Sequence, residues 1–404
     1  MTSRERVMKA LSRQEPDRVP FDLGGTESSG ITGIAYNRLR DHLGLRQGRT
    51  QIFDVYQQIA KIEDDLREIL GPDTIPLLIE PLRWKPFTLP DGSPCQIPEK
   101  WNPEKDERGD LVVKNAEGVV VARMPEAGFY FEPVFPPLAN VQSAAELGAH
   151  ADDIESSDWP SFADEPLDSI AARAKRLCEK TDLTVVANLQ LHLLAAGQIL
   201  RGYAAFMMDL VINKNLAHGL LEMLTDAYIR RAEQYLDRTS DHIQVVLVND
   251  DLGTQRGPML SPESYREMIW PYQKRLFEFI KRKSGAFLLF HSCGSVYQFI
   301  PSLIEAGVDA LNPVQVSAYQ MNGADLKREF GKDITFWGGG CDTQQVLARG
   351  SPAQVRDEVK RRMADLAAGG GFVFTQVHNI QPDVPPENIM AMFDAFTQYR
   401  DYAG

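Results

Sequence analysis

The stretch of residues 243–293 decides the fold. It opens with IQVVLVNDD (residues 243–251), closes with AFLLFHSC (residues 286–293), and carries an amphipathic segment in between that starts at Ser261 and Pro262. The two ends are short apolar runs typical of strands buried on both faces, and serine followed by proline is a typical helix start. The stretch therefore predicts a strand, a helix and a second, parallel strand.

The same alternation extends in both directions from this stretch. Eight apolar runs qualify as strands, at residues 19–25, 75–80, 183–190, 243–251, 286–293, 308–315, 334–340 and 372–378. Eight parallel strands, each followed by a helix, form a closed (β/α)₈ or TIM barrel. Because one such barrel can accommodate all 404 residues, 43% of them hydrophobic, we expect a single α/β domain over residues 1–404.

Residues 81–141 interrupt the barrel pattern with proline, glycine, charged residues and short alternating segments. This composition predicts hairpins inserted after the second strand. An insertion at the C-terminal end of a barrel strand lies on the face where active sites are built. We weigh two interpretations equally, a lid over the site and a segment that serves packing only.

Charge and composition exclude several classes of partner. The net charge is -13, which disfavours nucleic acid, and no apolar run reaches the length needed to cross a membrane. Residues 1–10 are charged and do not resemble a signal peptide, and 4 cysteines are too few for a disulfide framework. We expect a cytoplasmic protein, as a monomer or a homodimer.

Polar residues gather at the ends of the predicted strands. Since barrel enzymes place their chemistry at strand C-termini, these residues are the candidate site. Candidates for substrate binding are Glu80, Asn188, Asn249, Gln315, Gln376 and Asn379.

A second group consists of titratable residues, namely Asp250, Asp251 and His378. Adjacent residues of a strand face opposite ways, so at most one of the two aspartates enters the barrel easily, as a proton donor or a substrate acceptor. Their alternative role is to cap the turn after the strand. For His378 we hold substrate binding and anchoring of the loop at residues 382–385 as equal alternatives.

His291, Cys293 and Cys341 form a candidate metal site. His291 and Cys293 are two apart on one strand and so face the same side, and Cys341 follows the next strand but one. Two thiolates and one imidazole suit zinc, and three protein ligands leave a fourth position for substrate. Glu80 is a candidate extra ligand. From spacing alone, ordinary burial of the three side chains is an equal alternative.

Three motifs carry a resemblance to a known family. His291-Ser292-Cys293-Gly294, the stretch NPVQ at residues 312–315 and the stretch WGGGCD at residues 337–342 resemble the uroporphyrinogen decarboxylase superfamily, and more narrowly its zinc- and corrinoid-linked methyltransferase branch. The resemblance covers nearly the whole chain. It implies a (β/α)₈ barrel and zinc held by the histidine–cysteine pair and a later cysteine, which corresponds here to Cys341.

The same resemblance directs the functional expectation. Decarboxylases of the superfamily carry an RQAGRY-type segment after the first strand, where this chain has GGTESS at residues 24–29 and therefore no arginine clamp for a tetrapyrrole. We expect a zinc-dependent methyltransferase that moves a methyl group between a small substrate (a methyl ether, a methylamine or a thiol) and the cobalt of a separate corrinoid protein. Alternatives are a decarboxylase and a non-catalytic barrel that binds a small ligand or zinc.

Overall fold

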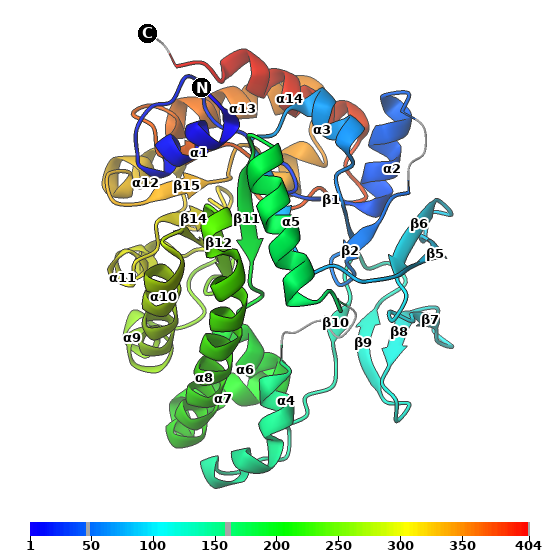
Figure 1. The fold of residues 1–404 in the computed structure, drawn as a ribbon, viewed down its shortest axis with the longest axis vertical. Coiled ribbons are helices and arrows are strands. Elements are labelled where there is room, and N and C mark those ends of the chain that lie inside the picture. The colour runs from blue at the N-terminus through cyan, green and yellow to red at the C-terminus, as the bar shows by residue number, and fades with distance from the viewer. Residues whose placement is uncertain (46–48, 158–162, 403–404) are drawn as a thin grey trace.

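A sheet of seven parallel strands curls through the centre of the molecule (Figure 1). The computed structural model describes residues 1–45, 49–157 and 163–402. Within them, the strand order around the sheet is β16-β15-β14-β13-β12-β11-β4. The bounds are β4 (Thr74–Leu77), β11 (Thr184–Asn188), β12 (Val245–Asn249), β13 (Phe287–His291), β14 (Ala310–Asn312), β15 (Thr335–Trp337) and β16 (Phe372–Val373).

The segment around Phe21 closes the ring between the two edge strands. Phe21 forms a parallel bridge with Phe374, just beyond β16, and its carbonyl accepts the N–H of Asp73, just before β4, at 2.7 Å. This segment takes the place of the first strand predicted at 19–25, but it is shorter than predicted because Gly24 turns the chain with φ 71°. The predicted (β/α)₈ barrel is confirmed, with its first strand reduced to a bridge.

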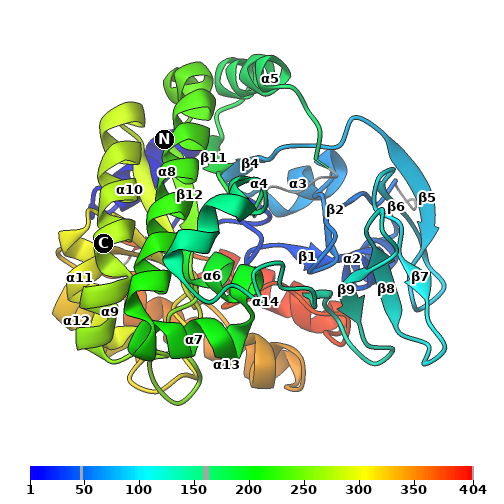
Figure 2. The ribbon, with the colours of Figure 1, turned by 90° about the horizontal axis from the view of Figure 1, so that it is seen from below.

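Helices surround the sheet. In both views α8 and α10 lie side by side outside β11 and β12 (Figures 1 and 2). The helix bounds are α1 (Ser3–Leu11), α2 (Gly33–His42), α3 (Asp64–Leu70), α4 (Ala151–Glu155), α5 (Leu167–Lys180), α6 (Leu193–Arg201), α7 (Tyr203–Ile212), α8 (Lys214–Thr239), α9 (Pro262–Met268), α10 (Trp270–Ser284), α11 (Ile300–Glu305), α12 (Gly323–Phe330), α13 (Pro352–Leu366) and α14 (Pro386–Tyr399). Short 3-10 turns lie at Ala144–His150, Ser240–His242 and Tyr297–Phe299, and one π turn at Thr343–Leu347. Among the described helices, none is both long and apolar enough to span a lipid bilayer.

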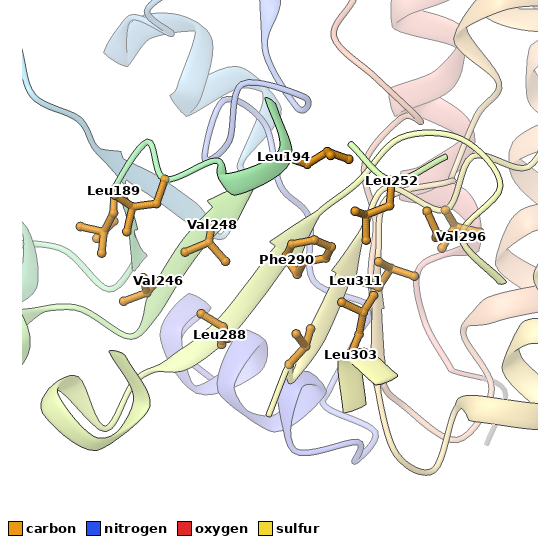
Figure 3. Packing of buried hydrophobic residues seen from close by; sticks show 14 of the residues in the cluster. Leu189, Leu194, Val246, Val248, Leu252, Leu288, Phe290, Val296, Leu303 and Leu311 are labelled. Carbon is orange, nitrogen blue, oxygen red and sulfur yellow. The ribbon is translucent and has the colours of Figure 1, made fainter. Parts of the chain in front are cut away.

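Alternate residues of the strands pack on opposite faces of the sheet. Side chains such as Val246 and Phe290 pack outward against the helices (Figure 3). A separate buried cluster fills the barrel and is closed off by α1; it consists of Val7, Ala10, Leu11, Val186, Val245, Leu247, Leu289, Ala310, Trp337 and Val373. The period of two therefore fixes which strand-end side chains point into the barrel.

Two small antiparallel sheets and a hairpin lie to one side of the barrel. The predicted hairpins at residues 81–141 are present as β5 (Trp84–Thr88) with β6 (Pro94–Pro98), and as a sheet of order β10-β9-β8-β7. The strands of that sheet are β7 (Glu104–Lys105), β8 (Leu111–Lys114), β9 (Val120–Met124) and β10 (Glu132–Pro133). The third unit was not predicted: β1 (Ile31–Thr32), β3 (Ile59–Ala60) and β2 (Ile52–Asp54) pair in that order.

Candidate active site

His291 is the last residue of β13, and its ring is held by one amide. Leu289, two residues earlier, lies in the barrel interior, so the period of two turns His291 inward as well. Its Nδ1 lies 2.7 Å from Oδ1 of Asn312, whose Nδ2 donates to the carbonyl of Trp337 at 3.0 Å. Because that second bond fixes Oδ1 as the acceptor, the imidazole proton is on Nδ1, and Nε2 presents a lone pair to the mouth of the barrel.

Cys293 follows on the same face, and its Sγ lies 3.5 Å from Nε2 of His291. The loop that carries Cys293 requires glycine: Gly294 has φ 83°, and a Cβ there would lie 2.3 Å from the carbonyl carbon of Gly253. The backbone N–H of Cys293 also donates to Oδ1 of Asp251 at 2.8 Å. Burial raises the pKa of the Cys293 thiol well above its usual range, so the thiol is protonated in the absence of a cation.

His378, beyond β16, completes a cluster of three donor side chains. One ligand atom each from His291, Cys293 and His378 lie within 4.8 Å of one another. The two imidazole rings are 6.0 Å apart, centroid to centroid. Burial, and then the neighbouring His291, lower the pKa of His378 to about 4, so that its ring is neutral at pH 7 and free to bind a cation.

Cys341, which the sequence predicts as a further ligand, is not part of this cluster in the described structure. It is fully buried, and its Sγ approaches the carbonyl of Asp342 at 3.9 Å. Burial raises the pKa of its thiol, and the charged groups that act on it are Asp342 and the α13 residues Glu358 and Arg362. Gly338 and Gly339 bend the chain before it, with φ near 90°, so strand periodicity does not carry over to Cys341.

Asp250 and Asp251 face opposite ways, as expected of neighbours in an extended segment. Asp250 is buried and accepts the backbone N–H groups of Leu194 and Ala195, at the start of α6, and Nε2 of Gln273. Burial raises the pKa of Asp250 to about 6. Its role in the described structure is that of a helix cap. Asp251 is half exposed instead, with Oδ1 at 3.8 Å from Nε2 of His291.

An open cavity of about 530 Å³ leads to the cluster. Cys293, His378, Gln315 and Asn379 line it, so four of the predicted site residues meet there. Phe129 and Tyr130, which belong to the predicted lid-like insertion, line it as well.

The comparisons with known proteins agree with this architecture. The sequence profile described as uroporphyrinogen decarboxylase (URO-D) matches residues 136–399. The chain belongs to the URO-D family. Curated relatives include the uroporphyrinogen decarboxylases of Pseudoalteromonas translucida, 28% identical over 187 residues (45% of this chain and 48% of the relative), and of Serratia proteamaculans, 29% identical over 182 residues (44% and 47%). The chain thus spans about half the length of these relatives.

A methyltransferase from Methanosarcina mazei has a similar structure, with a TM-score of 0.59, 16% identity and 99% coverage of both chains. At this identity the likeness shows a common fold only. Together with the family match it confirms the resemblance to the superfamily and the barrel. The region that matches the family profile contains His291, Cys293 and His378, and it begins at residue 136, after Tyr130.

The remaining predicted site residues fall into two groups. Asn249 ends β12 beside His291, Gln315 accepts the N–H of Gly294 at 2.6 Å, and Asn379 donates to Gln57 at 2.7 Å, so these three lie around the cluster. Glu80 instead bonds to Lys61 at 2.9 Å and pairs with Arg173 at 3.2 Å, which neutralises its charge away from the cluster.

Two further candidates, Gln376 and Asn188, form hydrogen bonds that hold other residues at the mouth of the barrel. Gln376 is buried and donates to the carbonyls of Ser28 and Gly30, both at 3.4 Å, and so ties the first loop of this URO-D barrel to its last strand. Asn188 donates to Oε1 of Glu27 at 2.5 Å.

Four residues of the mouth are not among the site candidates predicted from the sequence, namely Glu27, Asp54, Tyr130 and Asn312, although Asn312 stands in a motif that carries the resemblance. Three of them lie in the first 135 residues, before the matched URO-D region. For Glu27 there was a signal, since it stands in the run GGTESS directly after the first strand. For Asn312 the signal was its position two residues after the interior residue Ala310.

Proposed function

We propose that this chain is a zinc-dependent methyltransferase that moves a methyl group between a small substrate and the cobalt of a separate corrinoid protein. The observation that supports it best is the convergence of His291, Cys293 and His378, of which Cys293 and His378 line an open cavity. One donor atom from each of the three side chains lies within 4.8 Å of the others, so a single cation could reach all three.

The donor set fits zinc. Two imidazole nitrogens and one sulfur are borderline-soft ligands, and a site with three protein ligands keeps a position open for substrate, as catalytic zinc sites do. Asn312 holds His291 in the tautomer that a ligand requires, and His378 is neutral because its pKa is lowered to about 4. We therefore propose His378, in place of Cys341, as the third ligand.

Bound zinc would supply Lewis acidity to the oxygen, nitrogen or sulfur of the substrate. The chain's own groups do the rest. Asp251, half exposed and 3.8 Å from His291, is placed to exchange a proton with a substrate heteroatom at the mouth. Phe129 and Tyr130 border the cavity, and we propose that the insertion covers the bound substrate and excludes water.

A decarboxylase is the second candidate because the curated relatives carry that name. Its substrate would be rich in carboxylates and would need several cationic partners. Among the described residues that line the cavity, Arg349 is the one arginine or lysine. The lining therefore favours a substrate with few negative charges.

Metal content tests the proposal. The protein is purified without chelators, and zinc is measured by mass spectrometry in the wild type and in His378→Ala, Cys293→Ala and Cys341→Ala. We expect about one zinc per chain in the wild type and in Cys341→Ala, and loss in the other two. A folded wild type without zinc would refute the proposal, and retention in His378→Ala with loss in Cys341→Ala would restore the ligand set expected from the sequence.

Methyl transfer is then assayed with a reduced corrinoid protein and a panel of methyl ethers, methylamines and thiols, by the absorbance change of the cobalt. We expect turnover with at least one class in the zinc-loaded chain. Decarboxylation of a carboxylated tetrapyrrole by zinc-free protein would favour the second candidate instead.

A further inference from the structure

Glu27 is a buried carboxylate in the mouth that the proposed chemistry does not use. It lies in the loop after the first barrel segment and is 9% exposed. Its Oε1 accepts two amide N–H groups, from Asn188 at 2.5 Å and from Gln190 at 2.9 Å. Gln190 reaches it from a backbone with φ 50°, a conformation that non-glycine residues seldom adopt. The carboxylate is therefore held in one orientation.

The second oxygen of Glu27 has room for a further hydrogen bond. Among residues 1–45, 49–157 and 163–402, no side chain of another residue donates to Oε2, and the further group that bonds to the carboxylate is the backbone N–H of Glu27 itself. An ionised carboxylate has capacity for about four hydrogen bonds. A bound ligand that donates to Oε2 would use the capacity that remains.

Asp54 adds negative charge at the same place. It is the last residue of β2, and both its oxygens accept bonds from the following turn: Oδ1 from the N–H groups of Tyr56 and Gln57, and Oδ2 from Nε2 of Gln57 at 3.0 Å. In the described part of the chain neither Glu27 nor Asp54 forms an ion pair with lysine or arginine. Burial, and then the neighbouring Asp54, raise the pKa of Glu27 to about 7, and His192 acts on both carboxylates in the opposite direction. Two carboxylates thus face one imidazole, which leaves the pair with an excess of negative charge when both are ionised.

Two chains of contacts connect this acidic pair to the metal cluster. In the first, Gln57 binds Asp54 and accepts from Asn379 at 2.7 Å, and Asn379 directly follows His378 in the sequence. In the second, Ser28, next to Glu27, donates to Asn312 at 2.7 Å, and Asn312 holds His291. Both sites therefore belong to the same barrel mouth, at separate places on its wall.

We propose that Glu27, with Asp54 beside it, forms a cation subsite that binds an ammonium group of the small substrate. This inference rests on the proposed function in one respect, that the substrate reacts at the His–Cys–His cluster; the subsite then recognises the other part of the same molecule. An ammonium group supplies both a positive charge that offsets the second carboxylate and a donor or methyl contact for Oε2. A hydroxyl group supplies only the donor.

Matched pairs of ligands test the subsite on the full-length, zinc-loaded protein. Choline is compared with 3,3-dimethylbutan-1-ol, its uncharged isostere, and methylammonium with methanol, by titration calorimetry at pH 8. We expect at least one ammonium ligand to bind about tenfold or more tightly than its neutral partner, as a charge-assisted contact predicts. Equal binding within both pairs would overturn the proposal.

Variants assign the preference to Glu27. Glu27→Gln keeps the shape and the acceptor for Asn188 but removes the charge, and we expect it to abolish the preference for ammonium. Asp383→Asn removes the same charge from the cavity wall, 356 residues further along, and should leave the preference intact. If Glu27→Gln retains the preference, the subsite lies elsewhere and the proposal is wrong.

Zinc content and thermal unfolding of the same variants separate the two proposals. Retained zinc in Glu27→Gln shows that its loss of ammonium binding is not loss of the metal. If the wild type prefers ammonium but holds no zinc, the proposed function fails and the subsite stands. If it holds zinc without preferring ammonium, the subsite fails and the proposed function stands.

Discussion

Two walls of the barrel mouth differ in origin and in chemistry. One is built by the ends of β13 and β16, carries His291, Cys293 and His378, and lies within residues 136–399, which match the URO-D family. The other carries Glu27, Asp54 and Tyr130, which lie before that region. The first wall consists of neutral donors suited to a metal, and the second carries two carboxylates with an excess of negative charge.

Under the proposed function, the first wall would react with the substrate and the second would help to select it. Glu27 and Tyr130 of the second wall lie in loops, and Asp54 ends β2, a short strand outside the barrel. Loops accept sequence changes more readily than barrel strands, so we expect substitutions in the second wall to alter substrate preference with less cost to the fold.

The largest expected effect is the loss of methyl transfer when a residue of the first wall is removed. Replacing Cys293 or His378 by alanine should reduce methyl transfer to the background rate because a ligand of the proposed zinc is removed. Cys341→Ala, a buried cysteine outside the cluster, is the matched control and should retain activity while losing some stability. The assay is the change in cobalt absorbance, with zinc content measured in parallel. Equal losses of activity in all three variants would contradict the assignment of Cys293 and His378, but not Cys341, to the cluster.

Sequence reasoning predicted the first wall better than the second, for a physical reason. His291 and Cys293 follow from the period of two, which holds as long as the strand does. Cys341 and His378 both lie several residues beyond their strands, where turns such as Gly338 and Gly339 reset the direction of the side chains. Periodicity alone could therefore not choose between Cys341 and His378.

Asp250 and Asp251 also show the limit of strand periodicity as a guide to side-chain direction. The sequence established that they face opposite ways, but not which of them faces the barrel. The interior residue Leu247 decides it, since Asn249 and Asp251 follow at intervals of two. The second wall was missed because Glu27 and Asp54 depend on contacts with residues more than 100 positions away or on an unpredicted small sheet.

A second, smaller effect tests how the first wall is held. Asn312→Leu removes the acceptor that fixes the tautomer of His291, and we expect zinc affinity to fall about 10- to 100-fold. Asn249→Leu, at the end of the neighbouring strand, is the control and should change zinc affinity little. Competition with a chromogenic chelator measures both. Identical affinities in Asn312→Leu and the wild type would mean that Asn312 has no part in orienting the ligand.

The third prediction concerns the second wall and the pH dependence of its affinity for choline. The charged groups that face Glu27 are Asp54, from β2, and His192, before α6. Because its pKa is raised to about 7, Glu27 gains its negative charge as the pH rises, and choline affinity should increase about tenfold between about pH 6 and 8. Glu27→Gln should show no such increase. A pH-independent affinity in the wild type would contradict a role for this carboxylate.

The same shift has a consequence for stability. Between its usual pKa of 4.5 and its raised pKa of about 7, Glu27 keeps its proton in the folded chain and loses it in the unfolded chain. The folded state then binds more protons, so the free energy of unfolding falls as the pH rises through this window. Glu27→Gln removes this loss and should unfold at a higher temperature than the wild type at pH 8, but not at pH 4. Scanning calorimetry at both values checks the sign.

The smallest effect on activity separates two adjacent aspartates. Asp250→Asn removes the charge that caps α6, and we expect a loss of about 1–2 kcal/mol in the free energy of unfolding with little change in kcat. Asp251→Asn should do the reverse, lowering kcat while stability is kept, because its half-exposed carboxylate lies 3.8 Å from His291. Urea unfolding and steady-state kinetics on both variants measure the contrast. If Asp250→Asn also lowers kcat in folded protein, the contact between Asp250 and α6 affects the reaction at the cluster, and α6 then counts as part of the first wall.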